Sequence, residues 1–380
     1  MTRTLVVTND FPPRPGGIQT FVHELVRRLD PADVVVYASR WKGWEDFDRE
    51  QAFEVVREDT SMLLPTPAVR RRAQDLVKAH DCDSVLFGAA APLALLGPSL
   101  RSAGATRLVA LTHGHEAGWA QLPGPRQLLR RIGDGVDVVT YLGEYTRSRI
   151  AGALSPAAAD RMQQLTPGVD ADVFSPDADG QAVRMRYGLG DRPVVVCVSR
   201  LMRRKGQDTL IEAFPALKRR VPDAVLLIVG GGPYRKHLEE LAVASTWRDD
   251  IVFTGSVPWP ELPAHYAAGD VFAMPCRTRR HGLDVEGLGI VYLEASATGL
   301  PVLGGDSGGA PDAVLEGETG WVVPAGIDAP AALVSRLAEL LNGPALRARV
   351  GERGREWVQS DWSWGRQVER LNEIVTRRQP

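Results

Sequence analysis

The sequence predicts an α/β protein with two doubly wound parallel sheets, and three observations support this prediction. Short runs rich in Val, Ile and Leu alternate with helical stretches, and a Gly or Pro loop follows most of the runs. Nearly continuous apolar runs of this kind are typical of parallel strands buried on both faces. The 380 residues are too many for one ordinary core,. The series of runs also breaks near residues 166–180 and then resumes.

The candidate strands form two series, one on each side of this break. The first series covers residues 5–7, 34–38, 85–87, 108–111 and 136–141. The second covers residues 194–198, 225–229, 251–253, 271–274, 301–303 and 321–323. We interpret the polar stretch up to residue 180 as an interdomain linker, and residues 362–378 as a helix. The expected domains are residues 1–168 and 169–360, with a C-terminal helix in 361–380 that packs back on the first domain.

Composition indicates a soluble globular protein. Apolar residues make up 44% and charged residues 24% of the chain, and the net charge of −2 gives no overall field that would attract nucleic acid,. Cys82, Cys197 and Cys276 lack metal-ligand spacing, and we expect buried thiols in a reducing cytosol,. Residues 1–3 lead directly into a strand without a signal-peptide core, and no apolar stretch approaches the roughly 20 residues of a membrane span. The expected location is therefore the cytoplasm.

Three segments at strand ends carry residues suited to a phosphorylated ligand. Gly16 and Gly17 come after the first strand, where a glycine pair lets backbone N–H groups approach an anion at a helix start,. They do not form a G-x-G-x-x-G dinucleotide motif, which argues against a nicotinamide enzyme. Arg200 and Lys205 follow the strand at 194–198, where two cations can neutralise a diphosphate leaving group,. We interpret the intervening Arg203 and Arg204 as parts of a solvated basic turn.

The third segment contains two glutamates eight residues apart. Glu286 lies in a glycine-containing loop, and Glu294 follows in a predicted helix. Eight residues are about two helical turns, so we expect both carboxylates on one side. One could then bind a sugar hydroxyl and the other a ribose. The simpler alternative is a loop acid followed by an ordinary surface glutamate.

Together these motifs resemble retaining GT-B glycosyltransferases of the glycogen-synthase-like, E-x7-E type. The glycine pair, Arg200 with Lys205, Glu286 with Glu294, and the linker at 167–170 occur in the family's order over essentially the whole chain. The resemblance implies two Rossmann-like domains facing a central cleft. It assigns Arg200 and Lys205 to the diphosphate and Glu286 to the donor sugar, and it implies no metal cofactor. It also assigns the ribose to Glu294 and the nucleobase to Val257. The phosphates are assigned to the backbone of Leu288, Gly289, Ile290 and Val291.

The segment 112–116 ends another predicted strand and contains His113, His115 and Glu116. A metal site is disfavoured because no third, distant ligand accompanies this loop. A lone histidine is most often structural, but the family resemblance places His113 beside the donor sugar as a catalytic group. The Asp-x-Asp pairs 81/83, 170/172 and 177/179 imitate metal-binding motifs, and we interpret them as loop residues. Asp10 and Glu116 are the candidate nucleophiles in this domain, and family analogy favours same-face attack instead.

Residues 112–119 are also similar to the actinobacterial mannosyltransferases that act on phosphatidylinositol mannosides. This narrower resemblance implies GDP-mannose as donor, a glycolipid acceptor and peripheral attachment to the inner face of the membrane. Two segments have basic residues beside apolar ones. Arg70–Arg72 lie beside Leu63, Leu64, Val69, Leu76 and Val77, and Arg126, Arg130 and Arg131 lie among Leu122, Leu128, Leu129 and Ile132. Basic groups that flank an apolar face suit anionic lipid. Ordinary amphipathic helices, a soluble acceptor, a sugar-nucleotide epimerase and an inactive binding module remain as alternatives. The sequence does not indicate an oligomeric state.

Overall fold

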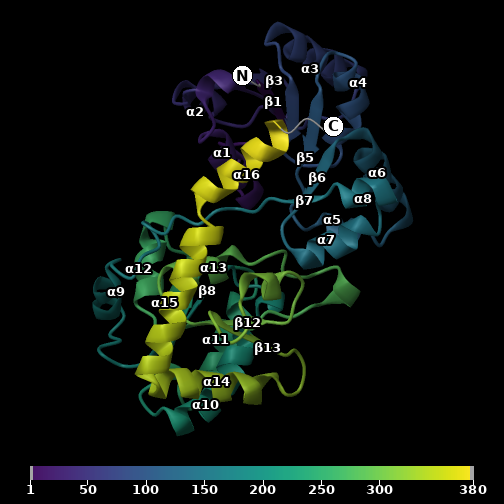
Figure 1. The fold of residues 1–380 in the computed structure, drawn as a ribbon. Helices are drawn as coiled ribbons and strands as arrows, with labels where there is room; N and C mark the ends of the chain where they lie inside the picture. The colour runs from purple at the N-terminus through teal and green to yellow at the C-terminus, as the bar shows by residue number, and fades with distance from the viewer. Residues whose placement is uncertain (1–2, 377–380) are drawn as a thin grey trace. The chain divides into compact units, whose positions relative to one another are not determined.

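The computed structural model describes residues 3–376, and the chain divides into two compact units. The first unit combines the residues up to 167 with those from 364 onward, and the second comprises residues 168–363. Each unit contains a fully parallel sheet with helices on both faces. The expected fold class is therefore confirmed (Figure 1).

The first sheet has the strand order β3-β2-β1-β4-β5-β6-β7. Its strands are β1 Thr4–Thr8, β2 Val34–Ser39, β3 Glu54–Glu58, β4 Ser84–Phe87, β5 Arg107–Ala110, β6 Val138–Tyr141 and β7 Gln163–Gln164. The direction of winding reverses between β1 and β4, and ligands of such sheets bind at the carboxyl ends of the strands beside this point. The strand prediction missed β3 and β7. Both are edge strands, and neither contains the long apolar run of a buried central strand.

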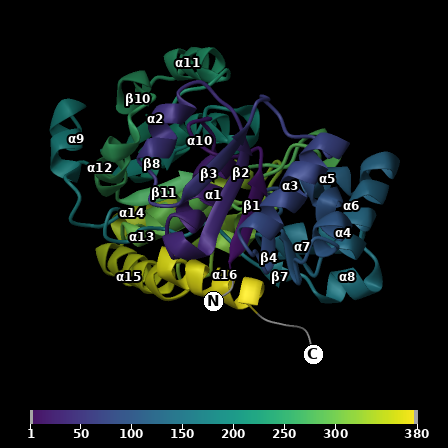
Figure 2. The same ribbon diagram turned by 90° about the horizontal axis from the view of Figure 1, so that it is seen from above.

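Helices cover both faces of this sheet because neighbouring residues of β1 point to opposite sides. Leu5 and Val7 pack in the core beneath α3, α4 and α6, whereas Val6 packs in the core that α1 and α16 complete. Figure 2 shows α3 on one side of β1 and α1 on the other. The helices of this unit are α1 Gly17–Val26, α2 Trp44–Arg49, α3 Pro67–Ala79, α4 Gly97–Arg101, α5 Glu116–Trp119, α6 Pro123–Gly135, α7 Glu144–Ala151, α8 Pro156–Asp160 and α16 Trp364–Thr376.

The C-terminal helix α16 packs against α1, β4 and β5 of the first unit. Arg107 on β5 donates from Nε to the carbonyl of Ile374, at 2.8 Å, which fixes the helix to the sheet. The predicted helix extends to residue 378, and its last two residues lie outside the described part of the chain.

The second sheet has the order β10-β9-β8-β11-β12-β13, with the reversal between β8 and β11. Its strands are β8 Val194–Val198, β9 Val225–Val229, β10 Ile251–Gly255, β11 Val271–Met274, β12 Val302–Gly305 and β13 Gly320–Val323. Helices α10 and α14 pack on one face, α12 and α13 pack on the other, and α15 packs on α13. The helices are α9 Gly180–Arg186, α10 Gln207–Arg220, α11 Arg235–Ala244, α12 Leu262–Ala267, α13 Ile290–Ala297, α14 Ala329–Asn342 and α15 Pro344–Asp361. The short 3-10 helices are η1 Pro31–Asp33, η2 Leu93–Leu96, η3 Arg203–Lys205, η4 Arg248–Asp250, η5 Trp259–Glu261, η6 Arg280–Gly282 and η7 Ala310–Ala313.

The stretch interpreted as a linker packs within the second unit. Val169 donates its N–H to the carbonyl of Trp362 at 2.7 Å, and Arg355 on α15 donates to the carbonyls of Ala171 and Phe174. Residues 168–180 are therefore a structured connection and not a loose tether.

The three cysteines are buried and unpaired with one another, as the sequence predicted. None of the helices in residues 3–376 is both long enough and apolar enough to cross a membrane.

Candidate active site

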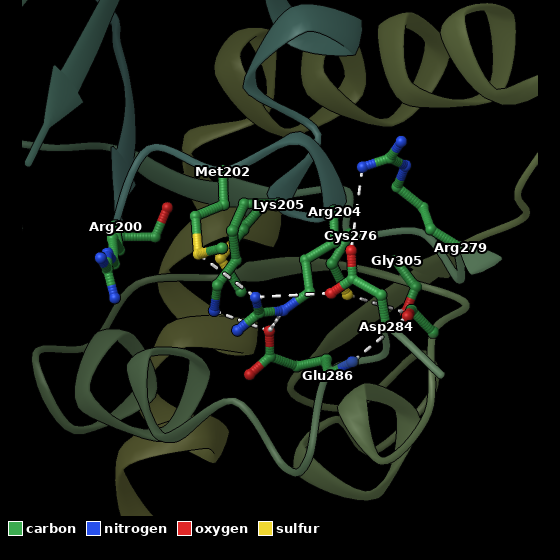
Figure 3. Close-up of polar contacts among 12 residues, drawn as sticks. Arg200, Met202, Arg204, Lys205, Cys276, Arg279, Asp284, Glu286 and Gly305 are labelled. Carbon is green, nitrogen blue, oxygen red and sulfur yellow. Dashed lines mark hydrogen bonds and ion pairs between the residues drawn. The ribbon is translucent and has the colours of Figure 1, made fainter. Parts of the chain in front are cut away.

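Arg200 and Lys205 follow β8 at the reversal point of the second sheet, but their environments differ. Arg200 is exposed, and its guanidinium forms no hydrogen bond or ion pair with any residue in 3–376. Lys205 is 8% exposed, and its Nζ lies 2.6 Å from Glu286 Oε2 (Figure 3). Gly206 has a φ of 77°, and a Cβ there would lie 2.0 Å from the Pro275 carbonyl oxygen. Only glycine allows this close approach, which brings the lysine to the loop after β11.

Glu286 lies in the loop between β11 and α13, and its backbone is held on both sides. Its N–H donates to Ser307 Oγ at 3.4 Å, and its carbonyl accepts from Gly309 N–H at 2.9 Å. A Cβ on Gly308, where φ is 58°, would lie 2.1 Å from the same carbonyl oxygen. The carboxylate is 7% exposed, so its charge depends on the neighbouring cations,.

The expected helical spacing of the two glutamates is wrong. Helix α13 begins at Ile290 after Gly289, where φ is 79°, so Glu286 is not part of the helix. Glu294 lies in the second turn, and its Oε2 accepts a hydrogen bond from Tyr266 OH at 2.7 Å. Burial raises the pKa of Glu294 to about 7. In the first turn of α13 the N–H of Tyr292 donates to the carbonyl of Gly289 at 3.0 Å. N–H groups at a helix start, such as those of Ile290 and Val291, suit a phosphate,.

Arg204 is also not the solvated side chain that the sequence predicted. Its side chain is 23% exposed, with Nε 3.8 Å from Glu286 Oε2 and one terminal nitrogen 3.7 Å from Asp284 Oδ1. Its neighbour Arg203 is exposed and lies over the ring of Tyr234, 5.3 Å from the centroid. The solvated interpretation therefore holds for Arg203 and fails for Arg204.

The cluster has more positive than negative charge. Arg279 lies 3.8 Å from Asp284 Oδ2 and completes a chain of ion pairs. The cations are Arg200, Arg204, Lys205 and Arg279, and the carboxylates are Asp284 and Glu286 (Figure 3). The excess of two positive charges suits a doubly anionic diphosphate.

A second network at the same edge was missed by the sequence analysis. Arg277 donates two hydrogen bonds to the carboxylate of Asp208, at 2.8 and 2.5 Å, and Tyr234 OH donates to the same group at 2.9 Å. These bonds join the start of α10 to the loops after β9 and β11. The available signal was position, since Arg277 and Tyr234 both follow predicted strands.

The glycines at 230–232 were missed as well, although three glycines directly follow the apolar run of β9. A Cβ on Gly230 would lie 2.1 Å from the carbonyl of Ser199, and one on Gly232 would lie 2.3 Å from that of Leu201. These glycines therefore let the loop pack against the segment that carries Arg200. Val257 follows the neighbouring strand β10 and is half-buried.

In the first unit, Gly16 and Gly17 open α1 directly after the β1 loop. This loop is fixed by Gln19, which donates to Asp10 Oδ1 at 2.6 Å, and by Arg57, which donates to the carbonyl of Pro12 at 2.7 Å. The glycine pair thus lies between the first strand and a helix start, as the sequence predicted, and the structure places it at the reversal point of the first sheet.

His113 follows β5 and is held as a neutral imidazole. Its Nε2 lies 2.6 Å from the carbonyl of Gly88, which can only accept, so Nε2 carries the proton,. Burial lowers the pKa of His113 and favours this uncharged form,. Its backbone N–H donates to Oε2 of the fully buried Glu116, at 2.9 Å. His115 is exposed.

Residues 3–376 contain no group of three His, Cys, Asp or Glu side chains arranged to hold a metal ion. Two of the Asp-x-Asp pairs have local roles instead. Asp170 accepts from the N–H groups of Asp172 and Val173, and Asp179 caps α9 by accepting from Ala182 N–H.

Comparison with known proteins places the chain in a family. The family model described as Glycosyl transferases group 1 matches residues 182–357, and Glycosyltransferase Family 4 matches residues 15–173. A GDP-mannose-dependent alpha-(1-6)-phosphatidylinositol monomannoside mannosyltransferase from Mycolicibacterium smegmatis is 55% identical, with 98% of each chain covered. The monoacylated-substrate counterpart from Corynebacterium glutamicum is 46% identical, with 98% of this chain and 97% of that one covered. The chain belongs to this family of GT-B glycosyltransferases.

The fold is shared with solved structures at much lower identity. Anabaena HepE, solved in complex with UDP, superposes with a TM-score of 0.80 at 18% identity, covering 98% of this chain and 99% of that one. As a glycosyltransferase, the protein carries its candidate residues in both matched regions, with Gly16, Gly17 and His113 in the first and Arg200, Lys205, Glu286 and Glu294 in the second.

Proposed function

We propose that this glycosyltransferase moves mannose from GDP-mannose to a phosphatidylinositol monomannoside, with retention of the α configuration. The observation that carries the proposal is the near-complete coverage by relatives named for that reaction, at 55% and 46% identity. The cationic cluster after β8 and β11 supports it, because departure of a nucleoside diphosphate is the step that such charge assists.

In this proposal Arg200 and Lys205 bind the diphosphate, and the N–H groups of residues 288–291 bind its oxygens. Glu286 binds the donor sugar and Glu294 the ribose. The backbone near Val257 contacts the guanine, and Gly16 and Gly17 are further donor-binding residues. A neutral His113 suits a position beside the reacting carbon, where it adds no charge that repels an oxocarbenium-like centre.

Same-face attack fits the two carboxylates that the first unit offers. Asp10 accepts from Gln19, and Glu116 is fully buried and accepts from the His113 N–H. Each accepts one structural hydrogen bond through one of its oxygens, and we infer same-face attack because the family analogy favours it. The leaving phosphate then acts as the base that takes the acceptor proton, and no metal is required.

The acceptor proposal includes attachment to anionic membrane through a basic edge beside α3. Most of the apolar residues expected to face lipid do not do so, because Leu63, Val69, Leu76 and Val77 pack in the core. Leu64, just before the helix, is 48% exposed as expected, and its neighbour Met62 is 52% exposed. Both residues precede the exposed Arg70–Arg72 in the sequence. We call Met62, Leu64 and Arg70–Arg72 the basic edge. In α6, Leu129 and Ile132 are likewise buried, whereas Leu122 is 46% exposed.

A donor-by-acceptor panel tests the proposal. The purified protein is offered GDP-mannose, GDP-glucose or UDP-glucose with either lipid-linked inositol monomannoside or soluble inositol phosphate, and the product linkage is read by NMR. The expected product is α-mannosylated lipid from GDP-mannose alone. Mannosylation of the soluble acceptor in preference would overturn the lipid assignment. Epimerised donor without transfer, or no turnover with any pair, would overturn the reaction itself.

A further inference from the structure

Arg204 lies close enough to Glu286 to act as its second counter-ion. Its Nε is 3.8 Å from Oε2, the same oxygen that Lys205 Nζ contacts at 2.6 Å (Figure 3). The other oxygen of Glu286 is not part of either ion pair. Both cations come from η3, and they approach one side of a single carboxylate.

Within residues 3–376, the Arg204 side chain has one unsatisfied hydrogen-bond donor, its Nε–H group. Its Nε is buried and has no hydrogen-bond acceptor within residues 3–376, and 3.8 Å is too long for a hydrogen bond,. A buried N–H without an acceptor costs free energy, and native structures rarely leave one. A side-chain movement of less than about 1 Å would bring this N–H to Glu286.

If the proposed function is correct, Lys205 interacts with two anions, Glu286 and the donor diphosphate. Its ammonium is a point charge that pairs with Glu286, and a bound diphosphate competes for it,. A carboxylate as buried as Glu286 is strongly destabilised when its counter-ion is removed,. A replacement cation is therefore needed at the moment when the donor binds.

We propose that Arg204 is a positioning residue that takes over the Glu286 carboxylate when a sugar-nucleotide diphosphate engages Lys205. The inference rests on the proposed function. Arg204 then holds Oε2, so that Glu286 keeps a counter-ion and its other oxygen can accept from a hydroxyl of the donor sugar. Asp284 holds the arginine in place from the opposite side, at 3.7 Å.

The other groups that face Glu286 cannot supply this charge. Cys276 follows β11, and burial raises the pKa of its thiol to about 11. Tyr292 on α13 has a pKa raised well above the usual range by burial. Asp284 is itself an anion and also pairs with Arg279. Within residues 3–376, Arg204 and Lys205 are the cations that lie within ion-pair distance of Glu286.

Arg204→Gln tests the exchange, and Arg203→Gln is its matched control. Arg203 is the adjacent residue of the same type, and it lies over Tyr234 without contacting Glu286. We expect the control to match wild type. Arg204→Gln should lose at least about tenfold in kcat and much of its preference for GDP-mannose over GDP. Arg204→Lys should restore part of both.

A double substitution separates this role from general stability. In a Glu286→Gln background the carboxylate is gone, so adding Arg204→Gln should not change GDP-mannose affinity further. An additive loss, or equal kcat for Arg204→Gln and Arg203→Gln, would overturn the exchange and leave the proposed function intact. If wild type transfers no mannose, the proposed function fails instead. Should Arg204→Gln melt early, Arg204→Lys carries the test, because its retained charge predicts that part of the wild-type kcat and of the discrimination between GDP-mannose and GDP is kept.

Discussion

Two of the three runs of three consecutive cations in this chain, Arg70–Arg72 and Arg203–Lys205, end in opposite environments. Arg70–Arg72 lie on α3, are exposed, and form no hydrogen bond or ion pair through their side chains with other residues in 3–376. Arg203–Lys205 form η3, where the exposure falls along the run until Lys205 is buried against Glu286. The first run presents charge to solvent, and the second inserts charge between carboxylates.

The difference lies in residues distant in sequence. Asp284 and Glu286 arrive from the loop after β11, and the parallel order β8-β11 brings that loop beside η3. A buried cation is stable only with such partners, whereas an exposed one needs none. A run of basic residues therefore acquires its role from what the topology places opposite it.

The largest expected effect concerns the buried cation. Lys205→Ala should reduce transfer about 10²–10³-fold, because it removes one charge-assisted contact to the departing diphosphate. Arg200→Ala should act similarly with less effect on folding, since its side chain is exposed. Steady-state kinetics on purified variants with unchanged circular dichroism measure this. Near-native turnover of either variant would show that the cluster is not the diphosphate site.

The exposed run should matter for membranes and not for chemistry. Arg71→Glu should weaken binding to vesicles containing anionic lipid at least about fivefold, since loss of one cation near such a surface alone costs roughly 1 kcal/mol and the added anion repels the lipid. Turnover of a detergent-dispersed acceptor should not change. Lys236→Glu is the matched control, because this side chain is 90% exposed in the second unit. Equal co-sedimentation of both variants would show that the basic edge does not bind the membrane.

A smaller effect separates the two glutamates of the site. Glu294 accepts a hydrogen bond from a hydroxyl group, whereas Glu286 pairs with cations. Burial raises the pKa of Glu294 from 4.5 to about 7. Between those pH values the folded state keeps a proton that the unfolded state releases, so stability falls as pH rises through the window. Glu294→Gln should therefore gain stability relative to wild type between pH 5 and pH 8.

Urea denaturation at the two pH values measures this gain. Glu240→Gln is a suitable control, because its side chain is 62% exposed and its pairing with Lys236 is long, at 4.0 Å. If the stabilities of Glu294→Gln and Glu240→Gln show the same pH dependence, the inference that folded Glu294 keeps its proton up to about pH 7 is wrong.

The smallest expected effect is none at all. Chelator treatment should leave turnover unchanged, because the excess positive charge of the cluster performs the role of a divalent ion. Loss of activity with EDTA and its return with Mg²⁺ or Mn²⁺ would show that these side chains are not sufficient.

Much of this architecture could be predicted because the central strands are continuous apolar runs. Val194–Val198, Val225–Val229 and Val271–Met274 match the expected bounds, whereas the edge strands β3 and β7 lack that signal. The motif residues were found for the same reason, since they directly follow recognisable strands.

The environment of each site residue could not be predicted, because it depends on contacts across the fold. Arg203 and Arg204 are identical neighbours, and only the loop that carries Asp284 distinguishes them. The helical spacing of Glu286 and Glu294 failed because Gly289 delays the helix start. In α3 the apolar positions were correctly recognised, but their partner is the core and not lipid.

A crystal structure of the protein with GDP-mannose would test the diphosphate site and the role of Arg204 together. We expect diphosphate oxygens within hydrogen-bond distance of Arg200 and Lys205, with Glu286 on a mannose hydroxyl and Arg204 closed onto the Glu286 carboxylate. A diphosphate held through a metal ion, or bound away from the β8 and β11 loops with Lys205 still paired to Glu286, would contradict this expectation.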